Sequence, residues 1–436
     1  MLANMKQFFQ VLMALAVFSG YPTSSFYVVG FSPSMRVHSC AMLHSQHNHL
    51  RYRTRDEVID KFVAVGTKKT PTSKQAEPSN AVHLPTIRSI AMSQALALFA
   101  VTTATAITFT ASGHPADLSS IHWNGSNEFY FLWDFHFTTT RVIEGVIATV
   151  PLVYLGTHIE RSDHRDECHC NFSTMNMVMT LFGRRAHDHK NNTVSHTPQT
   201  PMIHALFFSM ALAMVTGVSE EIVFRGIFPS VIFNFSQSTF ITLVGQAVLF
   251  ALGHLSPRSS FGENKVVTGL QATNGLWYGL VYLVTGGDIL PCIIAHALHD
   301  VHVFVETWMK INDQIDYTEF SVLQKLSLDD EVEIRRIKEE AGPSLSTETL
   351  AHARRFFYAF DYEHRGSLSE SDVKRAVSYA FLQDKVQPDE DRVSDLFETM
   401  LQQRDGKFIK KDSQNRLRLS EFFRLLFLLK ARAQSV

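Results

Sequence analysis

Six apolar segments follow one another between residues 90 and 305, and polar residues gather before and after them. Segments of this composition are typical of membrane-spanning helices, although several are shorter than twenty residues. The pattern predicts an all-α protein with a multi-pass transmembrane helical bundle over residues 88–310, in which the number of spans stays open. The segments are Ile90 to Ala111, Val142 to Gly156, Met202 to Val218, Phe240 to Leu252, Val266 to Val284 and Ile289 to Val305.

A large soluble helical core is the alternative to a membrane bundle. Between Arg88 and Asp117 the chain contains no Asp, Glu, Lys or Arg, whereas a helix on a soluble surface needs a charged face. This favours the membrane. The 40 Lys and Arg residues are balanced by 42 Asp and Glu residues, so no global field points to nucleic acid. We therefore expect membrane lipid as a partner and no nucleic acid.

Residues 1–87 differ from the apolar part of the chain. Phe8 to Phe18 form an apolar stretch of signal-peptide length, and Ser32 to Pro85 are rich in Ser, Thr, His, Lys and Arg. This composition predicts a signal- or transit-like leader and a disordered linker, similar to the two-part leaders of some plastid proteins. An uncleaved anchor with a disordered linker is the alternative. Plastid and endoplasmic reticulum membranes both remain open.

The segment from Glu160 to Thr200 is polar and rich in His, and we interpret it as a linker outside the membrane. Its cluster of His164, Cys168, His169 and Cys170 has metal-binding residue types. It lacks a second Cys/His pair at zinc-finger spacing, which favours a plain polar loop. The four cysteines of the chain are too few and too scattered for a disulfide framework.

Three polar insertions interrupt the later apolar segments and carry the candidate chemistry. Ionisable groups at membrane depth are costly unless they pair with one another or face a cavity. On a helix Glu221 and Arg225 are four residues apart and share a face, while Glu220 points about 100° away. We therefore expect Glu221 to pair with Arg225, and Glu220 to face the downstream histidines as a general base. The insertions consist of Glu220, Glu221 and Arg225, then His254, then His296 and Asp300.

The patterns E-E-x-x-x-R, F-x-x-x-H and H-x-x-x-D, in this order, resemble the type II CAAX prenyl protease and bacteriocin-processing (CPBP) family of intramembrane endopeptidases. The resemblance covers residues 202–305 and includes Phe224-Arg-Gly226, Gly279-Leu-Val-Tyr282 and Ala295-His-Ala297. It implies a hydrolase that cleaves a peptide bond near the C-terminus of a prenylated or other membrane-associated protein.

The resemblance also implies roles for single residues. Glu220 and His254 would activate water, His296 would donate to the developing oxyanion, and Glu221 and Arg225 would support them. Asp300 stands where the family usually has Asn. An ionised Asp cannot donate to an oxyanion, so Asp300 is either kept protonated by burial or orients His296 through a ring N–H.

Three alternatives concern the chemistry or the function. Glu220, His254 and His296 could bind zinc, but H-E-x-x-H is missing and the nearby Arg225 would compete for the acids, which favours a metal-free mechanism without a cofactor. A non-proteolytic membrane scaffold or chaperone with the same helices is the alternative function. A transporter with a proton relay is a third, although no internal repeat is visible.

Residues 330–436 are charged and show helical periodicity, which predicts a soluble helical domain. The stretch from Asp361 to Asp372 resembles an EF-hand loop with Gly366 at its sharp turn. Arg365 replaces a ligand, and a second loop would start at Lys410 with a basic residue. We expect a degenerate EF-hand pair with calcium-linked regulation, or else a plain protein-interaction domain. The candidate calcium ligands are Asp361, Glu363, Ser369 and Asp372.

Overall fold

A computed structural model gives the structure of the chain, and it describes a helical protein. The described residues are 82–111, 137–186, 199–256, 259–341, 347–381, 388–402 and 415–433. Nearly all of the predicted leader, and Lys410 of the second predicted loop, lie outside them.

All six apolar segments form helices, which confirms the prediction of an all-α membrane protein. Among the described residues, three stretches are long and apolar enough to cross a membrane: Leu84–Thr105, Thr139–Arg161 and Met202–Phe233. The helical bundle comprises α4 (Leu84–Ala111), α5 (Thr139–Arg161), α7 (Met202–Glu221), the π-helix η6 (Ile222–Ile227), α8 (Phe228–Ser236), α9 (Thr239–Gly253), α10 (Phe261–Val284) and α11 (Leu290–Leu323).

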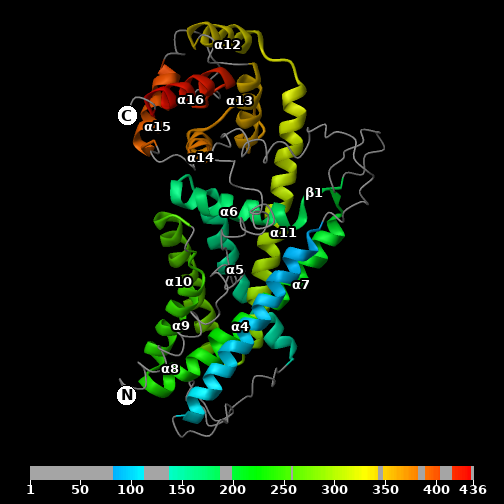
Figure 1. Cartoon of the computed structure of the whole chain (residues 1–436), viewed down its shortest axis with the longest axis vertical. Coiled ribbons are helices and arrows are strands. Elements are labelled where there is room, and N and C mark those ends of the chain that lie inside the picture. The colour runs from blue at the N-terminus through cyan, green and yellow to red at the C-terminus, as the bar shows by residue number, and fades with distance from the viewer. Residues whose placement is uncertain are drawn as a thin grey trace, which may run out of the picture.

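Helix α11 is the central element of the bundle (Figure 1). It packs against α5 and α7, α7 packs against α4, and α9 packs against α10. The outer sides of α4 and α5 expose large apolar residues such as Phe99, Ile147 and Val150, as a lipid-facing surface requires. Small residues bring the inner helices close, since a Cβ on Gly275 of α10 would lie 2.9 Å from the Cα of Ala247 on α9.

Helix α11 continues well past residue 310, where the sequence predicted the membrane part to end. Its 34 residues make it about 50 Å long, so it reaches from the bundle into the C-terminal domain, where it packs against α13 (Figure 1). Near its C-terminal end, Arg184 and Arg185 form ion pairs with Asp316. These arginines form β1 (Arg184–Arg185), which pairs in parallel with β2 (Gln199–Thr200).

The interpretation of Glu160 to Thr200 as a polar linker is wrong over α6 (Arg165–Phe182). This helix packs against α10, α11 and α14, and its Cys168, His169 and Cys170 are buried. Burial raises the pKa of the Cys168 thiol to about 12, so this group is no nucleophile at neutral pH. The His-rich start of the segment concealed the apolar face that follows it: Phe172, Met177, Val178 and Leu181.

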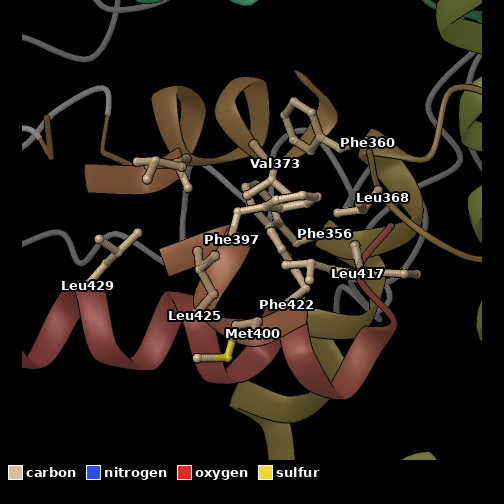
Figure 2. Packing of buried hydrophobic residues seen from close by; sticks show 14 of the residues in the cluster. Phe356, Phe360, Leu368, Val373, Phe397, Met400, Leu417, Phe422, Leu425 and Leu429 are labelled. Carbon is tan, nitrogen blue, oxygen red and sulfur yellow. The ribbon is translucent and has the colours of Figure 1, made fainter. Parts of the chain in front are cut away.

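The C-terminal residues form a helical domain with its own apolar core. Its helices are α12 (Leu328–Ala341), α13 (Thr347–Phe360), α14 (Glu370–Ala380), α15 (Glu390–Gln402) and α16 (Leu419–Ala433). Figure 2 shows Phe356, Phe397 and Phe422 meeting in this core. The core extends to Cys168 and Phe172 of α6. Helix α6 therefore joins the C-terminal domain to the bundle.

Candidate active site

The three polar insertions converge on one buried site between α7, η6, α9 and α11. The end of α7 supplies Glu220 and Glu221, and η6 supplies Arg225. His254 caps the C-terminus of α9, and α11 carries His296 and Asp300. All of these residues are buried: Glu221 and Arg225 have no exposed surface, and Asp300 is 6% exposed.

The predicted ion pair between Glu221 and Arg225 is present. Arg225 Nη1 donates to Glu221 Oε1 over 3.1 Å, and the guanidinium lies 4.6 Å from the ring centre of Phe250 and 4.8 Å from that of Tyr278. Aromatic faces and one carboxylate thus stabilise a cation that no water reaches. Glu221 neutralises the buried charge of Arg225, since it is the ion-pair partner of Arg225 in the described part of the chain.

Glu221 also binds a histidine, which the sequence argument did not predict. His296 Nδ1 lies 2.7 Å from Glu221 Oε1, the same oxygen that accepts from Arg225. The expectation that only Glu220 faces the histidines is therefore wrong. The His296 ring also stacks on Tyr278, with centroids 5.1 Å apart and planes 15° apart. Glu221 and Tyr278 together fix the orientation of this imidazole.

Glu220 and His254 face each other across a short gap. His254 Nδ1 lies 2.7 Å from the Phe250 carbonyl oxygen, which can only accept, so Nδ1 carries a proton and, in the neutral ring, Nε2 carries a lone pair. This Nε2 lies 3.8 Å from Glu220 Oε2. Neither atom has a hydrogen-bond partner among the described residues, although both are buried. His296 Nε2 approaches the same Glu220 oxygen at 3.8 Å.

Helix α4 contributes a polar residue that sequence reasoning missed. Gln94 Nε2 donates to Glu220 Oε1 over 3.3 Å, and Gln94 Oε1 accepts from Ser219 Oγ over 2.9 Å. Gln94 is 3% exposed. Its only sequence signal is an amide within an uncharged apolar segment, and such a signal does not identify a partner 126 residues away.

Asp300 lies beside the site without a hydrogen bond to His296. Its Oδ2 accepts from Thr216 Oγ1 over 3.0 Å and is 3.7 Å from His296 Nε2, beyond hydrogen-bond length. Glu221, and not Asp300, makes the hydrogen bond that orients the His296 ring. In the described part of the chain, no group of three or more His, Cys, Asp or Glu side chains is spaced to hold a metal ion.

The backbone changes its pitch at the site. After Glu221 the α-helical pattern gives way to the π-helix η6, in which the Phe228 N–H donates to the Val223 carbonyl five residues earlier. Such wide turns frequently occur at functional sites. Here the wide turn presents Arg225 to Glu221 while the helix continues as α8.

The candidate calcium ligands lie together on the loop between α13 and α14 and in the first turn of α14. Asp361 is fully buried, and Ser369 and Asp372 form a capping box at the start of α14. Burial raises the pKa of Asp372 above its usual value, against the hydrogen bonds from Ser369 that lower it. Arg416 Nη1 lies 2.7 Å from Glu363 Oε2.

The helical bundle and its buried cluster of two glutamates, two histidines and an arginine define an integral membrane protein with an ionisable site in its interior. Residues 202–302 match the family described as type II CAAX prenyl endopeptidase Rce1-like. This region contains all six predicted site residues of the bundle, whereas Gln94, α6 and the C-terminal domain lie outside it. Comparisons with curated proteins and with solved structures give no match. The matched family is a family of proteases, so the chain resembles an integral membrane endopeptidase over less than a quarter of its length.

Proposed function

We propose that the protein is an intramembrane endopeptidase in which Glu220 and His254 activate water to cleave a prenylated or other membrane-associated protein near its C-terminus. The facing pair of Glu220 Oε2 and His254 Nε2, buried and 3.8 Å apart, carries the proposal. A polar atom buried without a hydrogen bond is destabilising, so two such atoms aimed at each other indicate a shared ligand. The family match over this region supports the peptide bond as the target.

The geometry suits a water molecule bound by both side chains. A water about 2.8 Å from each atom sees them at an angle of about 85°, given their 3.8 Å separation. His254 accepts one hydrogen bond from this water, and Glu220 removes the other proton as the oxygen attacks the peptide carbonyl carbon. Glu220 then returns this proton to the departing amine when the carbon–nitrogen bond breaks.

His296 is the proposed donor to the oxyanion. Its Nδ1 is engaged with Glu221, so Nε2 points into the site near Glu220 and Asp300. To donate from Nε2, the ring must carry protons on both nitrogens, and the carboxylates of Glu221 and Asp300 balance the resulting charge. The Tyr278 stack holds the ring in place for this role.

Gln94 is the proposed positioning residue for Glu220. Because it donates to Oε1, it leaves Oε2 as the oxygen that faces both histidines. An ionised Glu220 can only accept, so the Gln94 nitrogen points toward it and the Gln94 oxygen lies 2.9 Å from Ser219 Oγ, whose single proton is shared with the Val215 carbonyl at 2.8 Å. The carboxylate is thereby oriented from a helix outside the family match.

The test is cleavage of a fluorescent peptide with a prenylated C-terminal Cys by the purified full chain in detergent. Glu220→Gln and His254→Ala should each lower kcat by about 100-fold or more. Glu144→Gln is the matched control, because Glu144 lies on α5 and pairs with Arg141. If the site variants cleave as fast as the control, the protein is no glutamate–histidine protease, and this result would favour the alternative of a non-proteolytic membrane scaffold. Full activity after treatment with a zinc chelator would exclude the zinc alternative.

A further inference from the structure

The loop between α13 and α14, with the first turn of α14, brings three carboxylates close to one side chain. The Arg416 guanidinium lies there, with Nη1 2.7 Å from Glu363 Oε2 and Nη2 3.6 Å from Asp372 Oδ2 and 4.0 Å from Asp361 Oδ1. In a calcium-binding EF-hand, these loop positions provide oxygens to the metal. A side-chain cation therefore occupies the space that a calcium ion would need.

Arg416 also binds the backbone of the loop. Its Nη2 donates to the Ser367 carbonyl over 2.8 Å, and its Nε donates to the same carbonyl over 3.2 Å and to Ser367 Oγ over 3.1 Å. Ser367 is the seventh residue from Asp361, the position whose carbonyl coordinates calcium in EF-hands. The planar guanidinium can satisfy carbonyl and carboxylate acceptors at once, since its donors form a fixed fork.

We propose that Arg416 is the resident cation of this loop, so that the C-terminal domain closes the loop without calcium. Oxygens of two of these carboxylates also accept hydrogen bonds from other groups of the protein. Asp361 Oδ2 accepts from the Gly366 N–H over 2.6 Å and from the Tyr317 hydroxyl over 2.5 Å. Asp372 Oδ2 accepts from Ser369 Oγ over 2.6 Å. The residues present therefore do not fit a calcium ion, which would need these oxygens and would meet a fixed positive charge.

The core of the domain sets the position of Arg416. Its neighbour Leu417 forms an antiparallel bridge with Leu368, with backbone hydrogen bonds of 2.8 and 2.9 Å in the two directions. Both leucines are fully buried in the core (Figure 2). Because neighbouring residues in extended chain point to opposite sides, burial of Leu417 turns Arg416 toward the loop.

The closed loop is attached to the helix that carries the candidate active site. From α11, Tyr317 donates to Asp361, and Gln314 Nε2 donates to the Asp361 carbonyl over 3.2 Å. The His364 ring stacks on Tyr317 with centroids 3.9 Å apart. With Arg416 in the loop, this attachment needs no calcium, whereas the sequence had suggested calcium-linked regulation. The inference does not depend on the proposed protease activity.

Thermal unfolding of the full chain in detergent tests the proposal, with 5 mM calcium compared with 5 mM magnesium. At this concentration a calcium site with a Kd of about 0.1 mM or tighter would raise the unfolding midpoint by several degrees. We expect the same midpoint with either ion. A rise that only calcium produces would overturn the proposal.

Variants of two arginines test the role of the guanidinium. Arg416→Gln should lower the midpoint by about 4–8 °C, because three carboxylates lose the cation that they share and Glu363 also loses a hydrogen-bond donor. The control is Arg418→Gln, since the Arg418 side chain is 41% exposed and only approaches Asp329 at 3.7 Å. If Arg416→Gln does not fold, Arg416→Lys keeps the charge without the fork and should melt below Arg418→Gln. Equal midpoints of the Arg416 and Arg418 variants would refute the assignment.

Discussion

Glu220 and Glu221 are neighbours in sequence, and we predict opposite consequences for their replacement. Glu221→Gln removes the negative charge that neutralises Arg225, whose side chain is fully buried. Glu220→Gln removes a charge whose one described hydrogen bond is the 3.3 Å contact with Gln94. The first variant should therefore lose stability, and the second should lose activity with the fold intact.

The size of the stability effect follows from the burial of the ion pair. Breaking a buried pair by removing one partner typically costs about 3–5 kcal/mol, because the other charge remains in a dry environment. A glutamine at 221 still offers an amide oxygen to Arg225, which favours the lower end, about 3 kcal/mol. For a domain of this size that lowers the unfolding midpoint by roughly 6–12 °C. Glu220→Gln changes one hydrogen bond worth about 1 kcal/mol, so its shift should stay below about 4 °C.

Two measurements on the same preparations distinguish the variants. Intrinsic fluorescence during heating in detergent gives the unfolding midpoint, and peptide cleavage below this midpoint gives kcat. The matched control is the double variant Glu221→Met with Arg225→Met, which removes both charges at similar side-chain volume. It should regain most of the stability, because no charge is stranded, but no activity, because His296 loses the acceptor of its Nδ1.

The outcome that would refute this reasoning is specific. If Glu220→Gln and Glu221→Gln unfold within about 2 °C of each other, the buried ion pair does not stabilise the bundle. If the double variant is no more stable than Glu221→Gln alone, the penalty does not come from a stranded Arg225.

Three further predictions concern residues around the pair. Gln94→Leu should lower kcat by about 10-fold and displace the pH–rate profile, because Glu220 loses the donor that orients it. An unchanged pH–rate profile would mean that Gln94 has a structural role only. Asp300→Asn should lower kcat by about 10-fold in the cleavage assay, because an amide oxygen still accepts from Thr216 but no longer balances the charge of His296. Asp300→Leu, which also loses the contact with Thr216, should lower kcat by about 100-fold. Gly275→Val should abolish the folded peak in size-exclusion chromatography, because α9 and α10 cannot separate without loss of packing, and a normal elution profile would contradict the close approach at this glycine.

The convergence of the polar insertions could be predicted from the sequence for a physical reason. Glu220, His254 and His296 belong to three separate apolar segments, and an ionisable group at membrane depth must find a partner on another helix. Helical spacing then paired Glu221 with Arg225, as the structure has it. The contact between Glu221 and Arg225 depends on the geometry of a single helix, and for this reason the sequence suffices to predict it.

The contacts that the sequence did not reveal all depend on how helices pack. Gln94 reaches Glu220 because α4 lies against α7, and no periodicity of α4 encodes that neighbour. The second contact of Glu221, to His296, depends on the rotation of α11. In the C-terminal domain, Arg416 enters the loop through the Leu368–Leu417 bridge, a pairing of residues 49 positions apart. The residues of the loop alone do not indicate that the Arg416 guanidinium lies among them.

The wide turn of η6 makes the chain sensitive to a change in length on one side of Arg225 only. A π-turn is related to an α-helix by one inserted residue, and in a regular helix one residue corresponds to about 100° of rotation and 1.5 Å of rise. Loss of one residue between Glu221 and Arg225 would swing the guanidinium away from Glu221, whereas loss of one residue after Arg225 would keep this pair and return the wide turn to α-helical pitch. The residues between Glu221 and Arg225 should therefore accept substitutions far more readily than insertions or deletions.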